Sequence, residues 1–267
     1  INGERDSVWT TWYENGNKKL QASYAKGKLN GEYTSWYNGG IIKEKNGDYL
    51  NNKKHNKWTY WSNKGQKIEE VNYNSGIHNG AHIKWFDDKN DQHKKFHVNY
   101  KNGNKDGSWR YWYSTGLDSI QSHFKNGVKD GHWIWWRNNG LKDKEGHFKN
   151  EKKHGVWTVW NDSTGSAYHK LHQETFVDGK IDGLVTKWYK EGKLDRQGVM
   201  RGNEKEGEWT YWERNGMRWL KFDYGDGLER VKLGEIEERD GITYKIGKYE
   251  PYVGIVEETG GKRGYKL

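Results

Sequence analysis

The sequence predicts an all-β fold: an elongated, twisted single-layer antiparallel sheet of successive β-hairpins, with about nine units of roughly 24 residues and a degenerate C-terminal cap. Three observations support this expectation. Tryptophans recur at a fixed spacing, Asn-Gly and Asp-Gly pairs separate the aromatic runs, and the chain has 35 glycines but only 1 proline. Tight turns with positive φ favour glycine, whereas proline interrupts strand pairing.

Each unit has two marked positions in a Gly-x-aromatic-x-x-Trp pattern. The first, which we call the anchor, is Trp9, Tyr33, Trp58, His82, Trp109, Trp133, Trp157, Val185 or Trp209. The second is always tryptophan: Trp12, Trp36, Trp61, Trp85, Trp112, Trp136, Trp160, Trp188 and Trp212. Strand alternation places this second tryptophan on one face with a threonine in most units. We therefore expect the second tryptophans to form a buried structural ladder.

The opposite face carries the anchor and the residues two and four positions later. It varies more between units, and we expect some of its aromatic side chains to be exposed. Tyrosine, tryptophan and arginine are the residues that most often dominate binding at protein interfaces. The candidate partner-binding residues are Trp109, Tyr111, Tyr113, Trp133, Trp135 and Arg137.

Two kinds of connection join the strands. A third marker always lies nine residues before the next anchor: Tyr24, Tyr49, Tyr73, Tyr100, Phe124, Phe148, Phe176 or Met200. The other connection, after the second tryptophan, varies in length and is longest in the units that begin at His82 and Trp157. The sheet is therefore expected to have one constant edge and one variable edge. Insertions confined to one side of a repeat array often mark a contact region.

The regular pattern ends near residue 222. We expect residues 1–222 to form the Trp-rich repeat array and residues 223–267 to form a degenerate repeat and capping segment. In that segment Leu233 and Ile236 would occupy the anchor and second positions. Residues 2–9 align with residues 102–109, so the sequence begins inside a repeat and further residues are expected before it.

Composition limits the possible function classes. Hydrophobic residues make up 31% of the chain, but it contains 17 Trp and 18 Tyr, and large aromatic rings can hold a thin sheet together. The absence of cysteine excludes disulfides, zinc fingers and a thiol nucleophile. No apolar run approaches the roughly 20 residues of a membrane-spanning helix. The net charge of +9 could attract anions, but Lys and Arg are scattered among Asp and Glu, so nucleic-acid binding is not expected.

No residue pattern points to catalysis, to a cofactor or to a metal. The pairs His78 with His82 and His93 with His97 share a strand face, but a metal site needs further ligands. His123 and His147 occupy equivalent positions and suggest a cross-strand ladder. The acidic side chains that precede the repeat glycine, Asp106, Asp130, Asp182 and Glu206, are explained by turn formation.

Residues 102–116 and 126–140 read Asn-Gly-x-Lys-x-Gly-x-Trp-x-x-Trp-Tyr-x-x-Gly with small changes. This spelling resembles the bacterial MORN-repeat variant found in YwqK-type antitoxin proteins, and residues 240–244 and 250–254 resemble a tail segment of that group. The resemblance implies a sheet of successive hairpins. It also implies that some relatives are immunity proteins, whereas other MORN proteins act as scaffolds or membrane-associated modules.

We therefore expect a non-enzymatic protein-binding module that acts in interaction or as a scaffold, with an immunity or antitoxin role as one specific form. The alternative is a structural component of a bacterial cell envelope or surface assembly, with glycan contacts on the anchor face. Another protein is the expected partner. The compartment stays open between the cell envelope or exterior and the cytoplasm.

Overall fold

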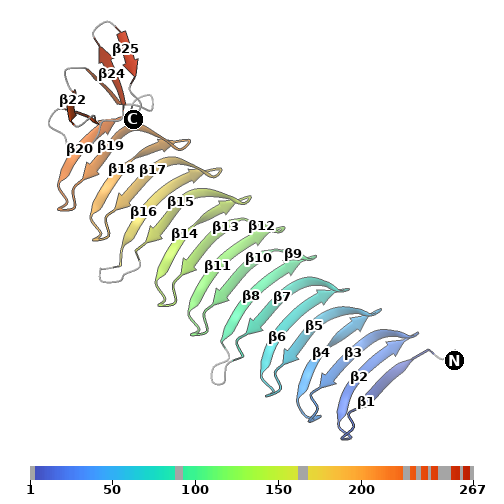
Figure 1. Ribbon diagram of the computed structural model, residues 1–267. Coiled ribbons are helices and arrows are strands. Elements are labelled where there is room, and N and C mark those ends of the chain that lie inside the picture. Colours follow the sequence, from blue (N-terminus) through green and yellow to red (C-terminus); the bar gives the residue numbers. More distant parts are fainter. Residues whose placement is uncertain are drawn as a thin grey trace. The chain divides into compact units, whose positions relative to one another are not determined.

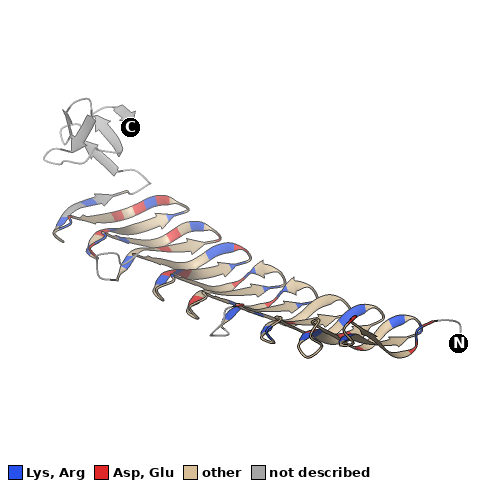
Figure 2. Cartoon of the chain, turned by 60° about the horizontal axis from the view of Figure 1, so that its bottom comes forward, with Lys and Arg blue, Asp and Glu red and all other residues tan. Residues whose placement is uncertain are grey.

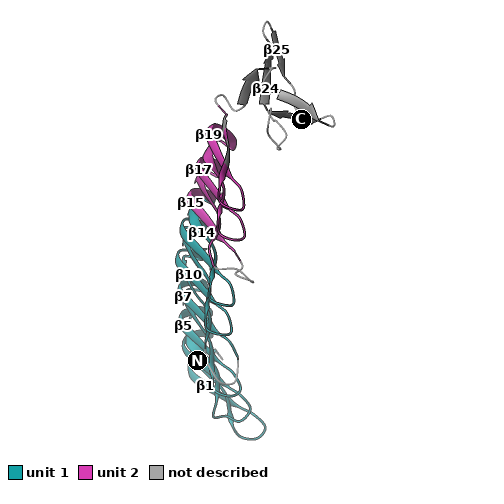
Figure 3. Ribbon diagram, turned by 90° about the vertical axis from the view of Figure 1, so that its left-hand side faces the viewer, with its two compact units in different colours: residues 1–151 teal, residues 152–267 magenta. Residues whose placement is uncertain are grey.

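The computed structural model describes residues 4–87, 93–161 and 168–224 and, in the C-terminal tail, residues 229–232, 236–239, 242–245, 254–258 and 261–264. The chain divides into two compact units (Figure 3), which we call unit 1 (residues 1–151) and unit 2 (residues 152–267). The predicted boundary at residues 222 and 223 stays a prediction.

Unit 1 consists of strands that pair in chain order as antiparallel hairpins (Figure 1). The strands are β1 (Ser7–Trp12), β2 (Lys18–Ala25), β3 (Lys28–Trp36), β4 (Lys43–Leu50), β5 (Lys53–Trp61), β6 (Lys67–Asn74), β7 (Ile77–Trp85), β8 (Lys94–Lys101), β9 (Asn104–Lys105), β10 (Gly107–Trp112), β11 (Asp118–Lys125), β12 (Val128–Lys129), β13 (Gly131–Trp136) and β14 (Lys142–Lys149). Each anchor and its second tryptophan lie in the same strand.

Unit 2 repeats this arrangement and then changes. Its hairpin strands are β15 (Lys152–Trp160), β16 (Lys170–Val177), β17 (Lys180–Trp188), β18 (Leu194–Arg201), β19 (Glu204–Trp212) and β20 (Arg218–Asp223). The tail contains β21 (Glu229–Lys232), β22 (Ile236–Arg239), β23 (Ile242–Lys245), β24 (Gly254–Glu258) and β25 (Gly261–Gly264). There β21 pairs with β24 in parallel, so the described tail leaves the regular hairpin order. Leu233 lies outside the described residues.

The predicted fold class is confirmed within each unit. The described residues form strands and turns without helices, and the neighbouring hairpin strands of each unit, up to β20, run antiparallel. Glycines with positive φ occupy the expected turns, for example Gly103 at 82° and Gly127 at 90°. Asn102 and Asn126 precede them with φ of 49° and 50°, a combination that the two-residue hairpin turns require.

Each hairpin contains two irregularities that shape its faces. One register shift falls between the anchor strand's last two residues, for example between Tyr111 and Trp112. The other falls just before the third marker, for example between Asn46 and Asp48. A bulge leaves a backbone group without a partner in the ladder. Beside this shift, the Asp48 carbonyl accepts a hydrogen bond of 2.9 Å from the indole Nε1–H of Trp58.

The same hydrogen bond from an indole N–H recurs at the other described tryptophan anchors whose preceding strand belongs to the same unit. Trp109 donates to the Asn99 carbonyl at 2.8 Å, and Trp133 donates to the His123 carbonyl at 3.1 Å. In unit 2, Trp209 donates to the Val199 carbonyl at 2.9 Å. Each donor lies ten residues after its acceptor, so the anchor fastens its strand to the preceding hairpin.

The constant edge has its length fixed by hydrogen bonds between successive turns. The Gly127 amide donates to the Lys105 carbonyl at 2.7 Å, and the Asn126 amide donates to Oδ1 of Asp106 at 3.0 Å. One hairpin earlier, the Gly103 amide donates to the His78 carbonyl at 2.8 Å. An inserted residue would move each turn away from its neighbour. Asp106 therefore joins successive hairpins, in addition to the turn-forming role that the sequence predicts.

The prediction of which tryptophans are buried is wrong. The anchors form the core: Trp58 is 0% exposed, Trp109 is 4% exposed and Trp133 is 8% exposed. The second tryptophans of the interior hairpins are only partly buried, and Trp12 is 58% exposed. The threonines beside them, such as Thr34 and Thr59, are the buried residues of that face.

Trp58 shows why the anchor is buried. Its ring lies against the backbone of Gly47, where an added Cβ would be 2.5 Å from the indole. The rings of Tyr49 and Tyr33 lie 4.9 and 5.6 Å away, and the Lys54 ammonium lies 4.8 Å above the ring centroid. A single-layer sheet can therefore bury a tryptophan with its own strands and one basic side chain.

Candidate functional site on the anchor face of unit 1

The anchor face of unit 1 is the side of the sheet that carries the anchors of β1 to β13. Of the predicted partner-binding residues, the structure brings Trp109, Tyr111, Trp133 and Trp135 together on this face. Trp109 and Trp133 are buried in its core, so the expectation that their rings are exposed is wrong. Tyr111 and Trp135 are partly buried and pack against that core. Their predicted contact with a partner stays a prediction.

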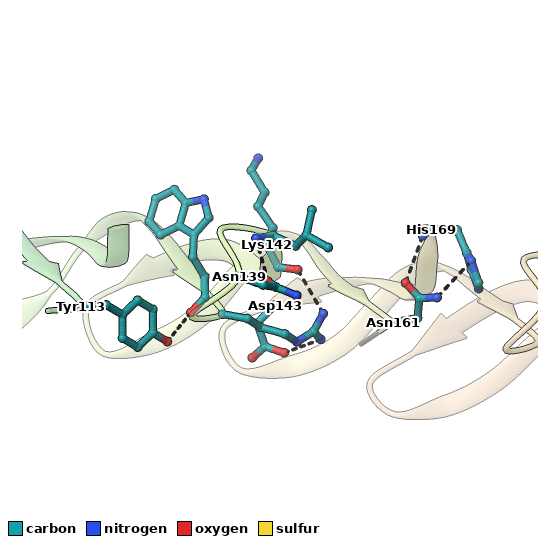
Figure 4. Close-up of polar contacts among 9 residues, drawn as sticks. Tyr113, Asn139, Lys142, Asp143, Asn161 and His169 are labelled. Carbon is teal, nitrogen blue, oxygen red and sulfur yellow. Dashed lines mark hydrogen bonds and ion pairs between the residues drawn. The ribbon is translucent and has the colours of Figure 1, made fainter. Parts of the chain in front are cut away.

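Tyr113, which Figure 4 labels, lies in the variable connection after β10, and Arg137 lies in the one after β13. The register shift after Tyr111 places its extra residue, Ser119, in β11, and the Tyr113 amide donates to the Leu117 carbonyl at 2.8 Å. The Tyr113 hydroxyl donates to the Trp136 carbonyl of the next hairpin at 2.8 Å. The Arg137 guanidinium donates to Oδ1 of Asp143 at 2.7 Å. Both residues therefore have structural partners at the variable edge.

Basic side chains lie over the tryptophan anchors. Lys105 Nζ lies 4.7 Å from the ring centroid of Trp109 and 4.8 Å from that of Phe124. Lys129 Nζ lies 5.7 Å from the centroid of Trp133, and the Arg5 guanidinium lies 4.8 Å from that of Trp9. A cation over an aromatic face is stabilised by the ring quadrupole, and its aliphatic stem adds apolar cover.

This cover follows a sequence rule that the spacing of aromatic residues alone did not indicate. A basic residue lies four positions before every tryptophan anchor: Arg5, Lys54, Lys105, Lys129, Lys153 and Lys205. The anchors that are not tryptophan, Tyr33, His82 and Val185, follow Leu29, His78 and Ile181 instead. The cation and the indole therefore occur as a pair, and comparison of the repeats within the chain could have found it.

The anchor face of unit 1 is rich in cations and poor in carboxylates. Its strand register also places Lys45, Lys84 and Lys144 on this side, beside Arg5 and the anchor-covering lysines. Its carboxylates include Glu44, which accepts a hydrogen bond from the Ser35 hydroxyl at 2.8 Å, and Glu69. Glu69 lies 2.6 Å from Nε2 of His82, and this hydrogen bond lowers the pKa of Glu69.

His82 replaces the tryptophan anchor in β7 and creates a local polar group within the aromatic core. The His78 ring lies 5.6 Å from the ring of His82, 4.8 Å from that of Tyr73 and 5.0 Å from that of Tyr100. Burial, followed by the charge of His82, lowers the pKa of His78 below 6.5. The folded protein therefore resists protonation at His78.

We expect His78 to reduce stability on acidification. The free energy of unfolding that neutral His78 contributes is fully present above the ordinary histidine pKa. It is lost as the pH falls from that value to the lower pKa of His78 in the folded state. His78→Leu, which copies Leu29 of another repeat, should narrow the difference in denaturation midpoint between about pH 7.5 and about pH 5. Equal differences in the two proteins would contradict this role.

The other predicted histidine pairs separate into structural contacts. His147 stacks on its cross-strand neighbour His132 at 4.6 Å, while Nδ1 of His123 lies 3.0 Å from the Asp130 carbonyl. His93 lies outside β8, with Nδ1 3.0 Å from the Ser114 carbonyl. The residues that the structure describes contain no group of three or more His, Cys, Asp or Glu side chains that could hold a metal ion.

The opposite face, which we call the second-tryptophan face, has a different charge pattern. Here cations also lie over rings, as with Lys43 at 6.0 Å from Trp61 and Lys67 at 5.7 Å from Trp85. However, several of its cations are paired with carboxylates, for example Lys67 with Glu70 at 2.8 Å and Lys142 with Glu145 at 2.8 Å. The two faces of unit 1 therefore differ most in carboxylate content.

The first hairpin matches a known protein family. Residues 5–26, which include β1 and β2, match the family described as the MORN repeat variant. This match supports a MORN-repeat identity for the hairpin, and such repeats generally serve as modules that bind proteins or membranes. No curated protein matches the chain. Among the residues described by the structure, none belongs to a helix with the length and apolar character to span a membrane.

Proposed function

We propose that this chain is a non-enzymatic repeat module that binds another protein through the anchor face of unit 1. The observation that carries the proposal is that one scaffold presents a varied set of side chains on this face. The paired cation and tryptophan at Lys54 and Trp58 become His78 and His82 in the next anchor strand. A purely structural sheet would need only the repeated pair, whereas a binding surface needs differences along its length.

A specific form of this proposal is an immunity or antitoxin role in a bacterium, as the resemblance to YwqK-type repeats suggests; a scaffold role is the broader form. An immunity protein must hold one partner tightly. Its side chains should therefore be fixed before binding, because ordering long side chains at an interface costs free energy. The cations seated on rings and the tyrosine hydroxyls bound to carbonyls support such preorganisation.

Affinity capture from the source cell tests the proposal. The tagged full chain should repeatedly recover one protein in stoichiometric amount after washing. Recovery of no stoichiometric protein in repeated captures would contradict the protein-binding function. Cell fractionation performed on the same material would assign the compartment, which the immunity role leaves open.

A second candidate is a structural component of a bacterial envelope or surface assembly that contacts glycans. One observation favours it at the variable edge: a shallow pocket between the first two hairpins, lined by Trp12, Tyr13, Glu14, Asn15, Lys19 and Asn38. Trp12 is 58% exposed, and Asn15 donates to Asn38 at 3.0 Å. An open ring with nearby amides suits a sugar, which needs both stacking and hydrogen bonds.

Titration of cell-wall glycan fragments against tryptophan fluorescence tests this candidate. Quenching should occur and should be lost in Trp12→Ala. On the anchor face, Trp135→Ala and Tyr111→Ala test the original expectation of glycan contact there. Absence of quenching by any fragment, or an exclusively cytosolic location, would eliminate the envelope function.

A further inference from the structure

We propose that the anchor face of unit 1 binds an acidic, extended segment of a protein partner, with carboxylates placed at the ammonium groups that cover the anchors. This inference rests on the proposed protein-binding function and names the chemistry of the partner. Lys and Arg recur at successive hairpins from the N-terminus onward (Figure 2). The two faces differ in how many carboxylates accompany these basic side chains.

The first step is the charge balance of the face. Its carboxylates include Glu44, which accepts from the Ser35 hydroxyl at 2.8 Å, and Glu69, whereas its basic side chains are Arg5, Lys45, Lys54, Lys84, Lys105, Lys129 and Lys144. Glu69 is already bonded to His82. Lys129 has one carboxylate partner from the turn that ends unit 1, Glu151 at 3.6 Å. The excess positive charge therefore lacks balancing carboxylates on this face, and an acidic partner would supply them.

The second step is the fixed position of the cations. Lys54 Nζ is held 4.8 Å from the Trp58 centroid and donates to the Tyr60 hydroxyl at 2.6 Å. Lys105 Nζ is held between Trp109 and Phe124. A lysine that is already ordered loses less rotamer freedom when it binds a carboxylate, so each contact is more favourable than one made by a free surface lysine.

The third step is spacing. Equivalent lysines of successive hairpins, such as Lys105 and Lys129, are separated by two strands, which is about 9.6 Å for a normal sheet. Three residues of a polyproline II chain advance about 9.3 Å and return to the same side. A partner with Asp or Glu at every third residue would therefore place successive carboxylates at successive lysines.

The fourth step separates a protein from a nucleic acid. Single-stranded nucleic acids gain much of their affinity by stacking bases on exposed aromatic rings. Here Trp58 is 0% exposed, Trp109 is 4% exposed and Trp133 is 8% exposed, because their own lysines cover them. Trp9 at the N-terminal end of the face is 46% exposed, but these interior tryptophan anchors combine positive charge with covered rings, which favours carboxylates of a peptide.

The test uses the full chain and a fluorescein-labelled peptide of about fifteen residues with Glu at every third position in a Pro- and Ser-rich background. The peptide should bind at about 0.15 M salt, and a version with Gln in place of Glu should not. Lys105→Gln and Lys129→Gln should each weaken binding about threefold, and together about tenfold.

The matched control is the double variant Lys43→Gln and Lys67→Gln on the second-tryptophan face. It removes the same charge as the Lys105 and Lys129 double variant. Like that variant, it changes one exposed lysine and one half-buried lysine, each of which lies over a tryptophan ring. Its affinity for the peptide should equal that of the parent chain. An equal loss in both double variants, or equal binding of the Glu and Gln peptides, would overturn the inference.

Two further outcomes would also overturn it. A single-stranded DNA oligonucleotide that binds more tightly than the peptide would assign the face to nucleic acid, and phosphatidylserine vesicles that do so would assign it to lipid. The proposed function fails separately: it fails if affinity capture recovers no partner. If a partner is recovered equally by the parent chain and by the Lys105 and Lys129 double variant, the function stands and this inference fails.

Discussion

Replacing Trp58 with alanine is expected to lower the free energy of unfolding by about 3–5 kcal/mol. Its side chain is 0% exposed, contacts the rings of Tyr33, Tyr49 and Tyr60, and donates Nε1–H to the Asp48 carbonyl. Truncation would leave a cavity and a carbonyl without its donor. Chemical denaturation, followed by circular dichroism, measures the change.

Trp61 in the same strand is the matched control. Its side chain is only partly buried, so Trp61→Ala should cost about 1–2 kcal/mol, less than Trp58→Ala. The same order should hold for Trp133→Ala and Trp136→Ala in β13. A larger loss at the second position in either strand would show that the anchor is not the main core residue.

Gly47→Ala is expected to destabilise the protein by at least about 2 kcal/mol. Its φ does not require glycine, but an added Cβ would lie 2.5 to 2.6 Å from atoms of the Trp58 ring. Real Cβ atoms do not approach this closely, so the ring or the strand must move. The denaturation midpoint of the purified variant measures the cost.

Two controls isolate the contact. Gly39→Ala adds the same methyl group where nothing lies within 4 Å and φ is ordinary, and it should change stability by less than about 0.5 kcal/mol. In a chain that already carries Trp58→Ala, the Gly47→Ala change should have almost no further cost. A full cost in that background would mean that the glycine is needed for a reason other than ring packing.

The fold was predictable because its signals are local and repeated. Asn102 with Gly103 and Asn126 with Gly127 are turn signals, and the structure gives these residues the positive φ that such turns need. The constant nine-residue spacing predicted an invariant edge, where the Gly127 amide bonds to the Lys105 carbonyl of the preceding hairpin. These features depend on neighbours within one repeat, so spacing alone indicates them.

Burial of the two faces was not predictable from strictness of spacing. The second position is always tryptophan, yet its interior members are only partly buried. The anchor varies, yet it forms the core because the strand opposite Tyr33 has Gly47, and the Trp58 ring lies against that glycine.

The candidate site was predicted only in part. Alternation correctly placed Tyr111 and Trp135 on the anchor side, where they pack against the aromatic core. It also predicted Tyr113 and Arg137 on that side, in the connections that follow β10 and β13, and the role of these two residues stays a prediction. The covering lysines were missed because charged residues were treated as a uniform solvated surface. The position four residues before the anchor is basic where the anchor is tryptophan, as at Lys105 and Lys129, and is not Lys or Arg where the anchor is another residue.

We expect the partner to contact the anchor face of unit 1 and not the second-tryptophan face. Parallel affinity captures from the source cell test it most directly, with the parent chain, the Lys105 and Lys129 double variant, and the Lys43 and Lys67 double variant. All three should be equally folded by circular dichroism. The partner should be depleted about tenfold with the first variant and unchanged with the second. Depletion with the second variant alone would contradict this expectation.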